Sequence, residues 1–114
     1  MNLQNHYWYF QSVIPPKVCD DIVRYANSIK DQIGVTGRFG NKKLNDNDIL
    51  DLKRERNSNI VWLYDKWIYR EIHPYVHRAN ENAGWNFEWD WSESCQFTKY
   101  EKGQYYDWHC DSFH

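Results

Sequence analysis

The chain has 114 residues, enough for one domain with a hydrophobic core, and we expect a single domain over residues 1–114. Aromatic residues make up 18% of it, with seven Trp and nine Tyr, which is typical of a globular protein with a core of large flat side chains and excludes a disordered chain. The formal net charge of -2 comes from interspersed charges of both signs, so the composition argues against binding to nucleic acid or to an anionic membrane.

The cysteine content and the first residues indicate the cellular compartment. The three cysteines include no C-x-x-C pair, and the opening MNLQNHYWYF lacks the basic and then apolar order of a signal peptide. No apolar run approaches the roughly 20 residues that a membrane-spanning helix needs. We therefore expect a soluble, cytoplasmic protein.

The first predicted element is an amphipathic helix in PPKVCDDIVRYANSIKDQI, residues 15–33. Prolines are tolerated at a helix start, and apolar residues recur with helical spacing along the segment. The next segment, GVTGRFGNKKLNDND (34–48), has three glycines and no apolar period, so it predicts a long surface loop. Such a loop is either a lid over a site or a mobile insertion, and the sequence leaves both open.

The second half of the chain predicts a strand, a helix and then further strands. NIVWL (59–63) is a short β-prone run, and residues 64–85 carry apolar side chains along one helical side, with a bend at Pro74. Three more strands are predicted in NFEWDW (86–91), SCQFTKY (94–100) and YYDWHCD (105–111). We therefore expect an α+β fold in which two N-terminal helices pack on one face of antiparallel strands.

The last predicted strand carries a candidate pair of metal ligands, His109 and Asp111. Alternate side chains of a strand share a face, so the two would project the same way with Cα atoms about 6.6 Å apart. An imidazole and a carboxylate suit a divalent first-row metal, and two histidines with one carboxylate are typical of non-haem Fe(II) oxygenases. The H-x-D pattern alone is weak evidence, because ordinary surface His and Asp residues also end strands.

A longer pattern surrounds this pair in ESCQFTKYEKGQYYDWHCD. Seven positions over nineteen residues are in register with one family motif: Glu93, Gln96, Tyr100, Gly103, Tyr106, His109 and Asp111. The chain thereby resembles the prolyl 4-hydroxylase branch of the Fe(II)/2-oxoglutarate dioxygenases. Upstream, RNSNIVWL is similar to the R-x-S-x-x-x-W segment of that family through Arg56, Ser58 and Trp62. The resemblance covers essentially the whole chain, although only the terminal motif is specific.

The resemblance implies an enzyme that hydroxylates a peptidyl substrate, with proline as the first candidate. Fe(II) and the cosubstrate 2-oxoglutarate would be required, with ascorbate as a further candidate cofactor. His109 and Asp111 would bind the iron, and the Tyr100 phenol would donate a hydrogen bond to a 2-oxoglutarate carboxylate. Four residues would contact the peptide or protein substrate: Tyr106, Arg56, Ser58 and Glu93. Gly103 would allow a tight turn, and no side-chain acid or base is implied.

The family's fold is a double-stranded β-helix, or jelly roll, and its motif continues past H-x-D. Further strands, a distal iron-binding histidine and a basic residue for 2-oxoglutarate would follow, and none of them comes after His114, which we do not assign as a ligand. We therefore expect the N-terminal portion of a catalytic domain, truncated or split, that self-associates or pairs with its missing C-terminal half. The alternative is a non-catalytic peptide- or partner-binding module with a relic H-x-D metal site.

Overall fold

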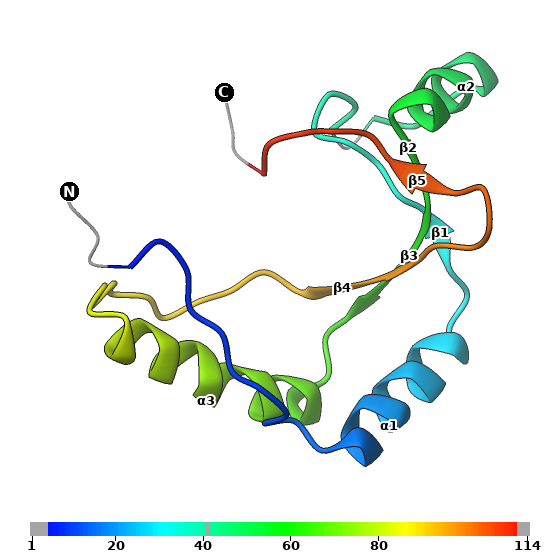
Figure 1. Ribbon diagram of the computed structural model, residues 1–114. Helices are drawn as coiled ribbons and strands as arrows, with labels where there is room; N and C mark the ends of the chain where they lie inside the picture. Colours follow the sequence, from blue (N-terminus) through cyan, green and yellow to red (C-terminus); the bar gives the residue numbers. More distant parts are fainter. Residues whose placement is uncertain (1–4, 41, 112–114) are drawn as a thin grey trace. The chain divides into compact units, whose positions relative to one another are not determined.

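The computed structural model describes residues 5–40 and 42–111. Figure 1 shows the elements in chain order: α1 (Pro16–Asn27), β1 (Gln32–Ile33), α2 (Asp46–Glu55), β2 (Arg56–Asn57), β3 (Asn59–Leu63), α3 (Lys66–Asn82), β4 (Cys95–Lys99) and β5 (Tyr105–Tyr106). The predicted α+β class is confirmed, with three helices and short strands in small open sheets among the described residues. Within the described ranges, no helix combines the length and the apolar character that a membrane crossing requires.

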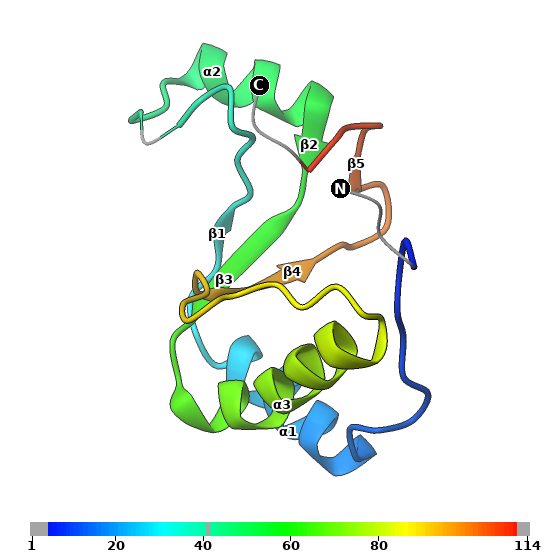
Figure 2. The ribbon, with the colours of Figure 1, turned by 90° about the vertical axis from the view of Figure 1, so that its left-hand side faces the viewer.

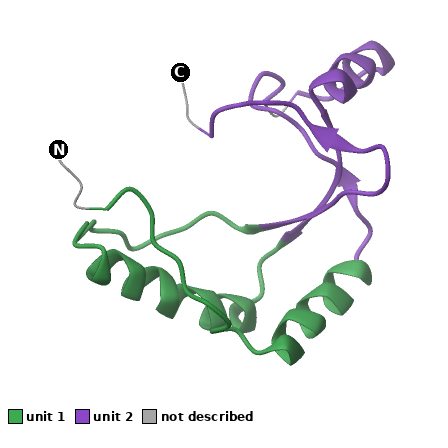
Figure 3. Cartoon of the chain, viewed as in Figure 1, with its two compact units in different colours: residues 1–28, 63–95 green, residues 29–62, 96–114 purple. Residues whose placement is uncertain are grey.

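The chain divides into two compact units (Figure 3). Unit 1 comprises residues 1–28 and 63–95, and unit 2 comprises residues 29–62 and 96–114. Helices α1 and α3 belong to unit 1. Helix α2 and the strands belong to unit 2, apart from Leu63 and Cys95 at the ends of β3 and β4. Each unit is described by itself.

In unit 1, α1 contacts the start of α3 through one tyrosine. The Tyr25 hydroxyl donates to the Asp65 carboxylate at 2.9 Å from each oxygen, and the Tyr25 ring lies edge-on to Trp67 with centroids 5.8 Å apart. The hydrogen bond to Asp65, then desolvation and the charge of that carboxylate, raise the pKa of Tyr25. Ala26 and Ile68 are buried in this unit.

Helix α1 ends earlier than predicted, because Ile33 pairs with a strand instead of continuing the helix. The Ser28 side chain donates to the Tyr25 carbonyl at 2.6 Å, which satisfies one of the free carbonyls at the helix end. Ile33 then pairs with Asn59 of β3. Its apolar spacing fits either structure, so pairing with a distant segment decides the outcome.

Residues 86–91, predicted as a strand, are irregular in the structure. The Asn80 side chain of α3 holds the backbone there, since its amide nitrogen donates to the Phe87 carbonyl at 2.8 Å and its oxygen accepts from the Phe87 N–H at 2.9 Å. Asn86 has a positive φ of 55°, which a regular strand does not allow. The alternation of aromatic and acidic residues therefore does not form a strand, and the prediction is wrong.

The described part of unit 2 contains two sheets. Strands β1, β3 and β4 lie in that order in one sheet, as Figure 2 shows, with Ile60 of β3 opposite Gln32 of β1 in antiparallel register. Strands β2 and β5 form the second, antiparallel sheet, in which Arg56 faces Tyr106. Leu52, Ile60 and Val61 are buried. A turn between β4 and β5 has the expected Gly103, at a φ of +86°, and a hydrogen bond from the Gln104 N–H to the Glu101 carbonyl at 2.9 Å.

Helix α2 was not predicted, and the expected loop over 34–48 runs into its first turn. A capping box begins the helix: the Asp48 N–H donates to the Asn45 side chain at 2.8 Å, and the Asn45 N–H donates to the Asp48 carboxylate at 3.2 Å. The backbone hydrogen bond from Asn45, then the contact with Lys42, lower the pKa of Asp48. The Asn and Asp residues read as loop residues are thus the cap of a helix.

Candidate metal centre

His109 and Asp111 lie beside each other in unit 2. The His109 Nε2 atom is 3.2 Å from the Asp111 Oδ1 atom. Two adjacent ligands of one ion, each bonded at about 2.1 Å, have donor atoms about 3 Å apart, so this separation fits a shared divalent cation. The side chain of His109 is 36% exposed and that of Asp111 is 94% exposed, so an ion from solvent can reach both.

A hydrogen bond to the backbone orients the His109 ring. Its Nδ1 atom lies 2.6 Å from the Asp107 carbonyl oxygen. A carbonyl only accepts, so Nδ1 donates in this contact, and Nε2, the nitrogen that faces Asp111, is the one placed to bind a metal. A hydrogen bond from the second ring nitrogen to a carbonyl or carboxylate is typical of histidines that bind metals.

The His109 ring also stacks on Tyr106, and the stack explains how the pair is placed. The ring centroids are 3.5 Å apart and the planes are inclined by 11°. In an unbroken strand His109 would point to the face opposite Tyr106, because the two are three residues apart. Strand β5 ends at Tyr106. The N–H of the next residue, Asp107, donates to the Glu55 carbonyl at 2.8 Å, and the chain then bends at Trp108. The predicted strand through Asp111 is therefore wrong.

On β2, Arg56 is buried and forms a network with neutral groups. Its Nε donates to the Ser58 hydroxyl at 2.8 Å, Nη1 to the Val35 carbonyl at 3.0 Å, and Nη2 to the Gln96 side chain at 2.8 Å. Its Cζ atom lies 4.7 Å from the centroid of the Tyr106 ring. Arg56 is 6% exposed and Ser58 only 1%. The network thus ends on the ring that stacks against His109.

A glycine makes room for this network. The Gly34 N–H donates to the Ser58 carbonyl at 2.9 Å, which holds the two backbones together. A Cβ on Gly34 would come within 2.7 Å of the Arg56 Nε atom and still closer to the Ser58 hydroxyl. The close approach therefore requires a residue without a side chain at position 34.

The residues predicted to contact substrate are distributed between the two units. Arg56, Ser58 and Tyr106 lie with His109 in unit 2, but the Arg56 and Ser58 side chains are buried and bonded to each other. Glu93 belongs to unit 1, where it is exposed in the irregular segment before β4. Tyr100, the predicted 2-oxoglutarate ligand, follows β4 in unit 2 and is 49% exposed. Its role stays a prediction.

Two contributors were missed by sequence reasoning. Gln96 was recognised as part of the motif but given no role, and the structure makes it an acceptor for Arg56. The Asp107 carbonyl is a backbone group, so no residue pattern announces it. Among residues 5–40 and 42–111, no group of three His, Cys, Asp or Glu residues converges to hold a metal, and His114 lies outside the described residues.

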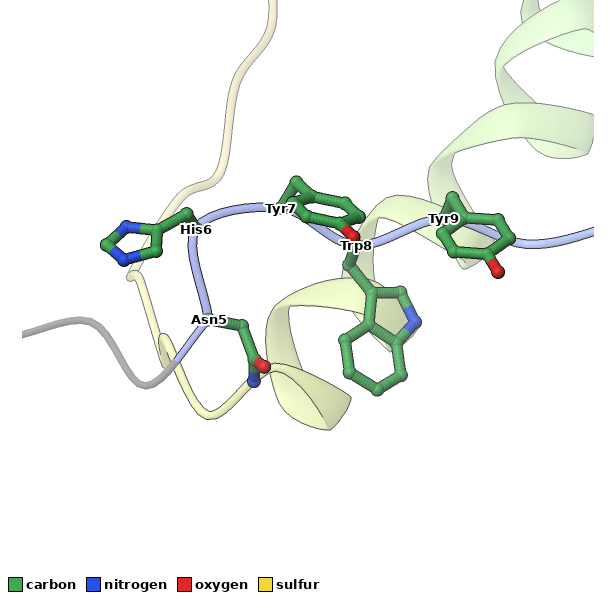
Figure 4. A pocket seen from close by; sticks show the side chains of 5 residues that line it. All are labelled: Asn5, His6, Tyr7, Trp8 and Tyr9. Atoms are coloured by element: carbon green, nitrogen blue, oxygen red, sulfur yellow. The ribbon is translucent and has the colours of Figure 1, made fainter.

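A hollow lies in unit 1, along the first described residues (Figure 4). Its volume is about 370 Å³ and its lining is Asn5, His6, Tyr7, Trp8 and Tyr9. The Tyr7 and Tyr9 rings are stacked with centroids 6.4 Å apart. Trp85 donates from its ring nitrogen to the Asn5 carbonyl at 2.6 Å, which ties the segment to the residues after α3. One histidine among aromatic and amide side chains offers neither a metal chelate nor an acid–base pair, so the His109–Asp111 pair remains the candidate site.

Comparison of the chain with models of known protein families, with curated proteins and with solved structures gave no match.

Proposed function

We propose that the chain is an Fe(II)/2-oxoglutarate-dependent dioxygenase that hydroxylates a peptidyl substrate, with a prolyl residue as the first candidate. One observation carries the proposal: the His109 Nε2 and Asp111 Oδ1 atoms are 3.2 Å apart. Because Nδ1 is engaged with the Asp107 carbonyl, Nε2 is the ring nitrogen that would bind the metal. The pair fits the donor set of a first-row divalent metal. The motif around it supplies the choice of iron and 2-oxoglutarate.

Each residue of the site has a stated task in this proposal. His109 and Asp111 hold the iron, and the Tyr100 hydroxyl donates to a 2-oxoglutarate carboxylate. When bound, iron and 2-oxoglutarate supply the oxidation of a substrate C–H bond by O2, coupled to decarboxylation of 2-oxoglutarate to succinate. The protein positions the reactants, and no side-chain acid or base is required. The two open sheets of unit 2 would then be part of a double-stranded β-helix.

A non-catalytic module is the second candidate, and the surface around the pair favours it. The described residues supply two converging ligands and no third. Trp108, which directly precedes His109 in the sequence, is 99% exposed. Trp residues are enriched among the residues that contribute most to binding at the centres of protein interfaces. In this reading the chain binds a peptide or a second protein, and His109 and Asp111 form a weak metal site.

Titration calorimetry with Mn(II), a redox-inert substitute for Fe(II), separates the two. We expect one Mn(II) per chain, at least tenfold tighter with 2-oxoglutarate present, because the cosubstrate would chelate the same ion. His109→Ala and Asp111→Ala should abolish this binding, whereas His6→Ala, which removes an exposed histidine of unit 1, should leave it unchanged. Equal affinities with and without 2-oxoglutarate would support the second candidate. No Mn(II) binding at all would overturn the enzyme proposal.

A further inference from the structure

We infer that Arg56 is a positioning residue for the metal ligand His109 and acts on it through the ring of Tyr106. That His109 binds a metal rests on the proposed function. That Arg56 and Tyr106 orient the His109 ring rests on the geometry of unit 2. It gives Arg56 and Ser58 a task other than contact with a peptide, because the donors of Arg56 are directed at internal acceptors and both residues are buried.

The anchor of the arrangement is the Arg56 guanidinium. Three acceptors from three separate segments fix it: the Val35 carbonyl after β1, the Ser58 hydroxyl between β2 and β3, and the Gln96 amide oxygen of β4. None of the three is a carboxylate, so they leave the positive charge uncompensated. In a buried site the face of an aromatic ring attracts such a charge, and the Tyr106 ring lies 4.7 Å from it.

The Tyr106 ring connects the anchor to the metal ligand. Arg56 and Tyr106 are directly opposite in the β2–β5 ladder, so their side chains share a face of that sheet. The His109 ring lies parallel to the Tyr106 ring with centroids 3.5 Å apart, which fills the space over one face of the phenol. The Arg56 Cζ atom lies 4.7 Å from the centroid of the Tyr106 ring. On the face of Tyr106 that His109 covers, the guanidinium would overlap the imidazole, so Arg56 lies against the opposite face of the Tyr106 ring.

His109 depends on this stack because the sheet does not hold it. The residue lies beyond β5, where ladder hydrogen bonds no longer fix the backbone. An imidazole rotates about two side-chain bonds: the stack sets the plane of the ring, and the contact of Nδ1 with the Asp107 carbonyl selects which edge turns toward Asp111. Locking the rotamer in advance saves the entropy that metal binding would otherwise have to overcome.

The test compares Arg56→Lys with Arg38→Lys. Lysine keeps the positive charge of Arg56 but lacks the planar fork that bonds three acceptors and stacks on a ring. Arg38 is the matched control in unit 2, because its Cζ lies 4.6 Å from the Phe39 centroid and its side chain is 58% exposed. Gln96→Ala is the second variant, for use if Arg56→Lys does not fold. It removes one of the three acceptors of Arg56, at an exposed residue, and so loosens the guanidinium.

The first readout is nitrogen-15 NMR of the His109 imidazole in the metal-free chain, in mildly alkaline buffer. We expect one Nδ1-protonated tautomer with ring protons shifted upfield by Tyr106, and averaged tautomers without that shift in Arg56→Lys or, more weakly, in Gln96→Ala. The second readout is Mn(II) affinity, which should fall about tenfold or more in Arg56→Lys, as expected when a group that orients a ligand is lost. Arg38→Lys should change neither.

The two readouts separate this inference from the proposed function. If the wild-type chain does not bind Mn(II), the proposed function fails, and the NMR comparison still decides whether Arg56 orients His109. If a folded Arg56→Lys chain, or Gln96→Ala where the lysine variant does not fold, keeps the wild-type tautomer and ring shifts, the inference is overturned. It is overturned equally if Arg38→Lys changes the His109 signals as much as Arg56→Lys does.

Discussion

The phenol ring of Tyr106 lies flat against the imidazole of His109, across the point where strand β5 ends. The contact joins a residue held by the sheet to one that the sheet does not hold. The chain between them therefore has to leave the extended conformation at Trp108 for the two rings to meet. That departure brings the His109 Nε2 atom to within 3.2 Å of the Asp111 Oδ1 atom.

Removing the aromatic ring at position 106 should release His109. Tyr106→Leu deletes the stacking surface, so the ring protons of His109 should move downfield toward the shifts of an exposed histidine. Tyr106→Phe keeps the ring and should preserve the wild-type shifts within a small margin, since the stack needs no hydroxyl. Proton NMR of the two variants makes the comparison. Equal shifts in both would mean that the stack does not exist in solution.

Adding one methyl group at Gly34 should destabilise unit 2. In Gly34→Ala the new carbon would collide with the Arg56 and Ser58 side chains, and we expect a loss of about 1–3 kcal/mol in the free energy of unfolding. Gly37→Ala is the control, because a Cβ there meets nothing within 4 Å, and its effect should stay within about 0.5 kcal/mol. Urea unfolding followed by circular dichroism measures both. A Gly34→Ala chain as stable as Gly37→Ala would contradict the close approach.

The capping box of α2 should make this helix sensitive to acid. The pKa of Asp48 is lowered in the folded chain, so its contribution to stability is present above the unfolded pKa, about 3.9, and is lost as the pH falls through the folded pKa. Asp48→Asn removes the titrating group and should flatten the pH dependence below about pH 4. Helical circular dichroism as a function of pH measures this. Identical acid profiles for Asp48→Asn and wild type would rule out the effect.

The Tyr25–Asp65 contact should have the opposite dependence, at alkaline pH. The pKa of Tyr25 is raised in the folded chain, so the contact contributes fully below the unfolded pKa, about 10, and its contribution is lost as the pH rises through the folded pKa. Tyr25→Phe should therefore be less stable than wild type near neutral pH, with a smaller difference at high pH. Unfolding by urea at several pH values supplies the data. A difference that grows with pH would refute the account.

Some of the fold was predictable from local pattern alone. The apolar spacing of residues in α1 and α3 predicts both helices, and Gly103 marks the turn before β5. Pairing between distant segments was not predictable, because Ile33 fits a helix by its spacing and becomes a strand residue only through Asn59. The end of α1 and the start of β1 therefore required the structure.

In the candidate site, too, local features were predictable from the sequence and long-range contacts were not. The sequence predicted that His109 and Asp111 project together from one strand, but no strand forms there, and a bend and a stack place the two side chains beside each other. The burial of Arg56 was not predictable, since it depends on the close approach of Gly34, which follows β1, to Ser58, which lies between β2 and β3. Long-range contacts of this kind leave no mark in the motif itself.

The most direct test of the account is the line broadening that Mn(II) causes in the histidine signals of the metal-free chain. The paramagnetic ion broadens the nearest nuclei first, and His6, His73 and His77 serve as internal references in unit 1. The account predicts that substoichiometric Mn(II) broadens the His109 ring signals before those three, and that Asp111→Ala removes this selectivity. Broadening that begins at His73 or His77, or that persists at His109 in Asp111→Ala, would contradict it.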